Sequence, residues 1–174
     1  MSNEAIFTLL VILAVASITD LWSHKIPNLI TYPAILGGII YHASLRGYEG
    51  LFFSLGGVGV GFALLMVMYF GGGTGAGDVK LMGAVGGILG PKGVWIAFLY
   101  SSLIGLVHAF ILLSWEGYLM SWFKRYATIL KTFLFTQQLN YLPPKGKERE
   151  LKISYGLSIA LGTGLYLFLG NCKG

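Results

Sequence analysis

The chain carries two aspartates, Asp20 and Asp78, each at the edge of a long apolar stretch. Two carboxyl groups that share one proton can hydrolyse a peptide bond, because one accepts a proton from water while the other hydrogen-bonds the scissile carbonyl. Each aspartate by itself has a structural explanation, since Asp20 can end a helix and Asp78 can cap the start of one. That explanation does not account for both aspartates lying at the same face of the membrane, as the topology below predicts. We therefore take the pair as the candidate catalytic residues. His24, four residues after Asp20, is a supporting candidate.

Asp78 lies within the glycine-rich stretch "GGGTGAGDVKLMGAVGG". Gly75 and Gly77 lack side chains that would crowd the carboxyl group, so a substrate backbone or another helix can approach closely. Lys80 is two residues beyond Asp78 and points elsewhere on a regular helix, so we expect it to extend toward the aqueous surface. Because glycine-rich stretches also serve tight helix packing, the four-residue pattern Gly-x-Gly-Asp is weak evidence by itself.

Composition indicates the kind of protein that positions these residues. The 174 residues are 55% hydrophobic and only 11% charged, with a mean hydropathy of +0.73, whereas soluble domains carry about 25% charged residues. We therefore predict an all-α polytopic membrane protein with a single membrane-embedded domain over residues 1–174. The net charge of +5 favours basic loops against anionic lipid and no nucleic acid partner. The one cysteine and the histidine spacing indicate no metal site, and we expect no cofactor.

Apolar segments predict about six transmembrane helices, since a helix needs about 20 residues to cross the hydrocarbon core. The segments are 5–22, 29–45, 51–70, 79–89, 94–115 and 153–169. The fourth covers only about 16 Å as a helix. We prefer a true span that is extended by the glycine-rich approach and shielded by neighbours, and a re-entrant segment stays open as the alternative. His42 is expected to pack or hydrogen-bond inside the bundle.

Lysine and arginine placement predicts the topology. Most of these residues fall in loops 20–28, 71–80 and 116–152, which the positive-inside rule assigns to the cytosol. Asp20 and Asp78 then both face the cytosol, and both chain ends lie outside. Within the cytosolic or interfacial loop of about residues 115–152, residues 115–142 place apolar and basic side chains at helical spacing, which predicts an amphipathic interfacial helix.

Three stretches carry a family resemblance. "TDLWSHKIPNLIT" at 19–31 includes Asp20, Pro27 and Asn28, "GAGDVKLMGAVGGILG" covers 75–90, and "ISYGLSIALG" covers 153–162. Together they resemble the type IV prepilin peptidase family, membrane aspartyl peptidases with a Gly-x-Gly-Asp motif. In the third stretch Ser154 replaces the family's proline. The resemblance implies that Asp20 and Asp78 are catalytic, with Pro27, Asn28, Gly75, Gly77 and Lys80 supporting them.

The resemblance also implies a substrate and a location. A prepilin or pseudopilin would lose its short basic leader at the cytosolic face of the inner membrane, just before its hydrophobic helix. The chain resembles the short, peptidase-only form, because it lacks the paired CxxC motifs that accompany N-methyltransferase activity in longer members. An archaeal preflagellin peptidase is similar. Two other classes stay open: a small proton- or ion-coupled transporter that uses the same aspartates, and a noncatalytic pilus assembly scaffold.

Overall fold

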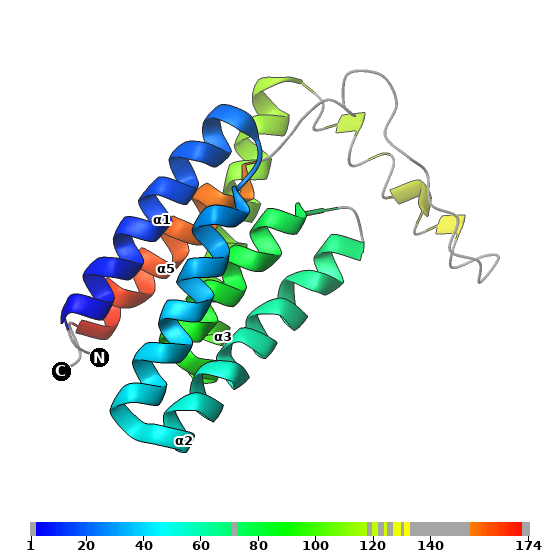
Figure 1. Ribbon diagram of the computed structural model, residues 1–174. Helices are drawn as coiled ribbons and strands as arrows, with labels where there is room; N and C mark the ends of the chain where they lie inside the picture. Colours follow the sequence, from blue (N-terminus) through cyan, green and yellow to red (C-terminus); the bar gives the residue numbers. More distant parts are fainter. Residues whose placement is uncertain are drawn as a thin grey trace. The chain divides into compact units, whose positions relative to one another are not determined.

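The computed structural model describes residues 3–70, 73–117, 120–121, 124, 127–129, 131–132 and 154–171. Its helices with defined bounds are α1 (Asn3–Ser23), α2 (Asn28–Phe70), α3 (Ala76–Trp115) and α5 (Tyr155–Asn171) (Figure 1). Among the described residues there is no strand. Three of the helices are long and apolar enough to cross a membrane, and α5 is apolar but shorter. The prediction of an all-α membrane protein is confirmed.

Two of these helices turn back on themselves at a glycine. Gly47 bends α2 with φ 57° and ψ −134°, and Gly90 bends α3 with φ 73° and ψ 178°. Both have the positive φ that glycine adopts most readily. Figure 1 shows α2 as a hairpin of two helical halves, and α3 reverses direction at its own bend. Apart from Ser154, which precedes α5, the described residues of the six predicted spans are thus helical. The number of helices that cross a membrane stays a prediction.

The fourth predicted span begins earlier than expected and is enclosed by its neighbours. It starts at Ala76 and runs to the bend at Gly90, and residues 81–90 are all buried. Gly57 and Gly86 meet backbone to backbone, and Gly61 meets the carbonyl of Met82 in the same way. Glycines four residues apart let two helices approach closely in a membrane. The expected shielding by neighbours is therefore present.

At the bend in α3, side chains of α2 form hydrogen bonds with two backbone carbonyl groups of α3. In a regular helix the carbonyl of Gly87 would accept from residue 91, which is a proline without an N–H. Ser54 Oγ instead donates to the Gly87 oxygen at 2.7 Å, and His42 Nε2 lies 2.9 Å from the Ile88 oxygen. The buried His42 ring also packs edge-on to Phe53. His42 has the packing and hydrogen-bonding role that the sequence predicts.

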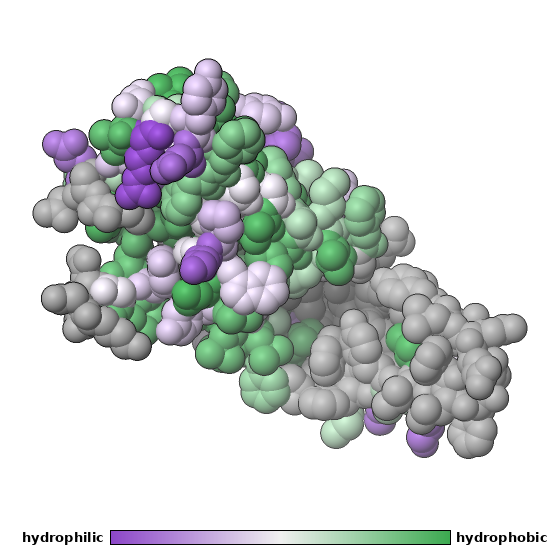
Figure 2. All heavy atoms as spheres, turned by 90° about the horizontal axis from the view of Figure 1, so that it is seen from below, coloured by the Kyte–Doolittle hydropathy of each residue, from purple (hydrophilic) through white to green (hydrophobic). Residues whose placement is uncertain are grey.

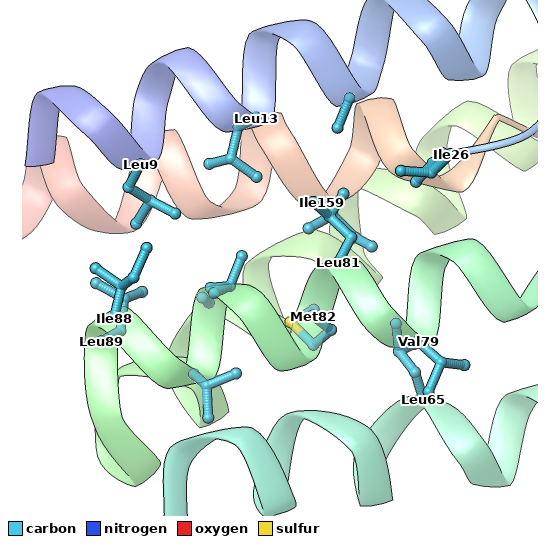
Figure 3. Packing of buried hydrophobic residues seen from close by; sticks show 14 of the residues in the cluster. Leu9, Leu13, Ile26, Leu65, Val79, Leu81, Met82, Ile88, Leu89 and Ile159 are labelled. Atoms are coloured by element: carbon cyan, nitrogen blue, oxygen red, sulfur yellow. The ribbon is translucent and has the colours of Figure 1, made fainter. Parts of the chain in front are cut away.

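The core joins α1, α3 and α5 at the centre of the bundle. Figure 3 shows Leu9 and Leu13 of α1 pointing toward α3, from which Leu81, Ile88 and Leu89 face them. Ile159 of α5 belongs to the same buried cluster. Figure 2, which looks onto the end of the molecule with the two bends, shows apolar side chains together with hydrophilic ones. Large apolar side chains cover much of the outside of the helices. Such a surface suits lipid contact.

Residues 106–153 form their own unit. Contacts divide the chain into Met1–Gly105 with Ser154–Gly174 and, separately, Leu106–Ile153. In the second unit the described residues between 120 and 132 are helical, and Thr128 Oγ1 donates to the Lys124 carbonyl at 2.8 Å. Most apolar positions of the predicted amphipathic helix lie outside the described residues. That helix and the single-domain organisation stay predictions.

Candidate active site

Asp20 lies in the last turn of α1 and is buried. A carboxylate at a helix C-terminus is electrostatically unfavourable, because the free carbonyls there carry partial negative charge. The start of α5 compensates, since the backbone N–H of Gly156 donates to Asp20 Oδ2 at 3.0 Å. Gly156 is the second residue of α5, and its N–H is among those without a partner inside the helix. Asp20 therefore joins the end of α1 to the start of α5.

Asp78 is buried in the first turn of α3. The backbone N–H of Gly75 donates to Asp78 Oδ2 at 2.9 Å, and the Asp78 N–H donates to the Gly75 carbonyl at 3.1 Å. The first of these bonds is one half of a capping box, in which the side chain of the third helical residue binds the N–H of the cap; glycine has no side chain to supply the other half. Asp78 thus stabilises the helix start, as its structural interpretation requires, although from the third helical position. Both aspartates are held by an N–H at the start of a helix.

The fold brings the two aspartates to one end of the bundle. Their charges are close enough to interact, and Asp78 also interacts electrostatically with Tyr155, the first residue of α5. Ile26 lies between the starts of α3 and α5. A Cβ on Gly77 would lie 3.1 Å from Ile26 Cβ, and one on Gly156 would lie 3.1 Å from Ile26 Cδ1. Figure 3 shows Ile26 in the loop after α1, beside the start of α5. One buried side chain therefore lies between the start of α3, which carries Asp78, and the start of α5, whose Gly156 binds Asp20.

The predicted supporting residues surround this arrangement. Gly75 binds Asp78 through its N–H, and a Cβ on Gly75 would lie 3.3 Å from Asp78 Oδ2. Pro27 precedes α2, and its carbonyl accepts the Ile30 N–H at 3.1 Å. Lys80 was expected to extend toward the aqueous surface, and in the structure its ammonium contacts the start of α2. It donates to Asn28 Oδ1 at 2.8 Å and lies 5.1 Å from the centre of the Tyr32 ring, so it joins the starts of α2 and α3.

Several residues at the site were not among the sequence candidates. Gly156, Tyr155 and Ile26 contact or interact with the aspartate segments as described above. Ser154 Oγ lies 3.3 Å from Nδ1 of His24, whose φ is 50° and whose charge interacts with Asp20. The resemblance of the stretch at 153–162 is the sequence signal for Ser154, Tyr155 and Gly156, but it assigns a role to none of them.

No cluster of potential metal ligands occurs in the part of the chain that the structure describes. The chemistry available at the site is that of two carboxyl groups with the hydrogen-bond donors that orient them. Such a pair can transfer protons to and from a water molecule and a polar substrate group.

Comparison with known families identifies the fold's relatives. The model of the type IV leader peptidase family matches residues 7–110. The chain belongs to the type IV leader peptidase family. The matched residues include both aspartates and all the predicted supporting residues, whereas Ser154, Tyr155 and Gly156 lie outside the match.

Two curated relatives of this leader peptidase family member are both named prepilin leader peptidase/N-methyltransferase. One is from Aeromonas salmonicida (strain A449) and the other from Aeromonas salmonicida. Each is 31% identical over 103 residues, which cover 55% of this chain and 35% of the relative. The chain thus matches about a third of the length of these relatives. No solved structure matches the chain significantly.

Proposed function

We propose that this leader peptidase family member is an aspartyl endopeptidase that removes the short basic leader of a prepilin or pseudopilin. The observation that carries the proposal is the pair of buried carboxylates, Asp20 and Asp78, at one end of the bundle. Each has Oδ2 bound by a backbone N–H from a helix start. Those hydrogen bonds fix the rotation of both carboxyl groups, and general acid–base catalysis requires such positioning.

The proposed reaction needs one ionised and one protonated carboxyl group. The ionised group takes a proton from water, and the water oxygen adds to the scissile carbonyl carbon while the protonated group hydrogen-bonds the carbonyl oxygen. Collapse of the tetrahedral intermediate then breaks the C–N bond, and the leaving nitrogen receives a proton from a carboxyl group. The products are a free leader carboxylate and a new amino terminus.

We further propose that the site faces the cytosol at the inner membrane. The argument is the distribution of lysine and arginine, which favours one face for the loops that carry Lys25 and Lys80. The same basic loops would contact anionic lipid. The ends of α1 and α2 and the starts of α2 and α3 lie at the same end of the bundle in Figure 1, consistent with a shared face for Asp20 and Asp78.

The test is cleavage of a purified candidate prepilin, followed by the mass of the products. Asp20→Asn and Asp78→Asn should each lower kcat by at least about a hundredfold, the lower range for a general acid–base residue, with the protein still inserted. Glu49→Gln removes an exposed carboxylate beside the Gly47 bend and should leave cleavage unchanged. Wild-type rates in Asp78→Asn would refute the catalytic assignment. Ion-dependent uptake into liposomes without any cleavage would instead support the transporter hypothesis.

Both relatives are named as N-methyltransferases as well as prepilin leader peptidases. We propose that this chain acts by peptide hydrolysis alone, because its one cysteine cannot form the paired CxxC motifs expected of the methylating form. The same mass measurement tests this point when the methyl donor S-adenosylmethionine is added. The new amino terminus should stay unmethylated, and a methylated product would contradict the proposal.

A further inference from the structure

Ser154 directly precedes α5, where a serine would ordinarily cap the helix. Because α5 begins at Tyr155, Ser154 has the N-cap position and Gly156 is the second helical residue. An N-cap serine accepts a hydrogen bond from the backbone N–H of the second or third helical residue. Among the described residues, the one hydrogen bond of Ser154 Oγ is instead with Nδ1 of His24, at 3.3 Å. The serine therefore does not cap the helix that it precedes.

Asp20 caps α5 in place of the serine. Its Oδ2 accepts the N–H of Gly156 at 3.0 Å, and this N–H is one of the two that an N-cap serine could bind. The Asp20 side chain also packs directly on Gly156, since a Cβ there would lie 3.2 Å from Asp20 Cβ. Serine has a single rotatable side-chain bond between heavy atoms, so one rotamer change could turn Oγ from His24 toward α5. Asp20 and Ser154 are thus alternative acceptors for the same N–H.

His24 has a backbone conformation that glycine would adopt more readily. It follows the last residue of α1, its N–H donates to the Asp20 carbonyl at 2.8 Å, and its φ is 50°. Helices commonly end at such a left-handed residue, which is usually glycine because a Cβ is unfavourable there. Among the described residues, His24 is the one residue other than glycine with a positive φ. A histidine at this position therefore needs a reason, and the contact of its ring with Ser154 supplies one.

The contact between His24 and Ser154 connects the same two helices as the bond that orients Asp20. His24 directly follows α1, which carries Asp20, and Ser154 directly precedes α5. All of these residues belong to the first compact unit of the chain. Ser154 is buried, and buried hydroxyl groups nearly always have a hydrogen-bond partner. Without the His24 ring, the Ser154 hydroxyl would therefore turn to an N–H of α5.

We propose that His24 is a positioning residue, which binds Ser154, keeps that serine from capping α5 and so leaves the N–H of Gly156 to orient Asp20. The inference rests on the proposed function, because Asp20 is taken there as a catalytic group. His24 acts through Ser154 and Gly156 and need not touch the substrate. Loss of the His24 ring should therefore lower kcat, which depends on the orientation of Asp20, and leave KM nearly unchanged.

His24→Gly removes the ring without disturbing the backbone, since glycine adopts a positive φ readily. With a full-length prepilin in mixed micelles, we expect kcat to fall at least about tenfold while KM changes less than about twofold. The variant should fold as well as wild type, so the loss of activity is separate from a loss of stability. A wild-type kcat in His24→Gly would overturn the inference.

Rescue by Ser154→Ala decides how His24 acts. Alanine cannot accept the N–H of Gly156, so adding Ser154→Ala to His24→Gly should restore kcat to within about twofold of wild type. The matched control is Ser23→Ala, which removes the hydroxyl that donates to the Thr19 carbonyl at 2.7 Å and should give no rescue. If His24 acts only through its charge on Asp20, Ser154→Ala will not rescue either, and the inference is wrong.

The amide proton of Gly156 reports its acceptor directly and needs no substrate. In protein labelled with isotopic nitrogen at glycine, the Gly156 signal is the one that Gly156→Ala lacks. A carboxylate acceptor gives a shorter and stronger hydrogen bond than a hydroxyl or an amide, so Asp20→Asn and His24→Gly should each shift this signal upfield. Adding Ser154→Ala to His24→Gly should return the signal to its wild-type position. An unmoved signal in His24→Gly would contradict the inference.

The proposed function and the role of His24 fail in different ways in these experiments. If wild type does not cleave, or Asp20→Asn cleaves normally, the catalytic proposal fails, whereas the Gly156 signal still decides whether His24 controls the acceptor. If Asp20→Asn abolishes cleavage while His24→Gly cleaves as wild type does, the catalytic proposal stands and the role of His24 is wrong.

Discussion

The N–H of Gly156 and Oδ2 of Asp20 lie 3.0 Å apart, although the two residues are separated by 136 positions in the chain. The carboxylate belongs to the last turn of α1 and the donor to the first turn of α5. The bond places an acid, which is unfavourable at its own helix end, on the favourable end of another helix. The orientation of Asp20 thus depends on a segment outside the region that matches the family model.

Replacing Gly156 by alanine should disturb Asp20 directly. The added Cβ would lie 2.9 Å from Asp20 Oδ2 and 3.1 Å from Ile26 Cδ1, so the carboxylate must move. A shift of about 1 Å at a catalytic group can lower the rate about a hundredfold, and we expect a fall in kcat of that order. The control is Gly164→Ala in the same helix, where a Cβ has no atom within 4 Å. It should retain wild-type kcat, and a wild-type kcat in Gly156→Ala would contradict the prediction.

Gly77→Ala should also reduce activity, for a reason that a second substitution can diagnose. Its Cβ would lie 3.1 Å from Cβ and 3.2 Å from the backbone nitrogen of Ile26. Because alanine retains both of those atoms, Ile26→Ala should not rescue the variant. We expect the kcat of Gly77→Ala to be at least about tenfold below that of wild type. The kcat of the double variant should be no higher than that of Gly77→Ala. Full recovery in the double variant would show that only the outer Ile26 side chain matters.

Local patterns in the sequence predicted much of this site, and long-range contacts account for the remainder. Apolar segments and the two aspartates at their edges sufficed to predict the helices that end near Asp20 and begin near Asp78. Helical geometry also predicted that Lys80 points away from Asp78. Its partner Asn28 lies 52 positions away, and no local pattern specifies which helices pack together. The bond from Gly156 escaped prediction for the same reason.

The hydrogen bond between Lys80 and Asn28 should couple the starts of α3 and α2. Lys80→Met retains most of the aliphatic stem and removes the donor, and Asn28→Ala removes the acceptor. In a double-mutant cycle measured by unfolding in mixed micelles, we expect a coupling free energy of about 0.5–1.5 kcal/mol. The cation also lies over the Tyr32 ring, so Lys80→Met should cost more than Asn28→Ala. Additive effects, within about 0.3 kcal/mol, would show that the contact does not stabilise the protein.

Ser54→Ala should destabilise the bend in α3 that carries Gly90. The serine hydroxyl donates to the buried Gly87 carbonyl at 2.7 Å, and residue 91, a proline, offers that carbonyl no N–H. Without Ser54 the carbonyl loses this donor, and a buried unpaired polar group costs about 1–3 kcal/mol of unfolding free energy.

Ser44→Ala is the matched control for Ser54→Ala on the same helix. Its hydroxyl donates to the Ile40 carbonyl one turn earlier and is exposed, so its loss should change the unfolding free energy by less than about 0.5 kcal/mol. Unfolding in mixed micelles compares the two variants. Equal effects would mean that the bend does not depend on the Ser54 hydroxyl, since His42 of α2 would still contact the Ile88 carbonyl.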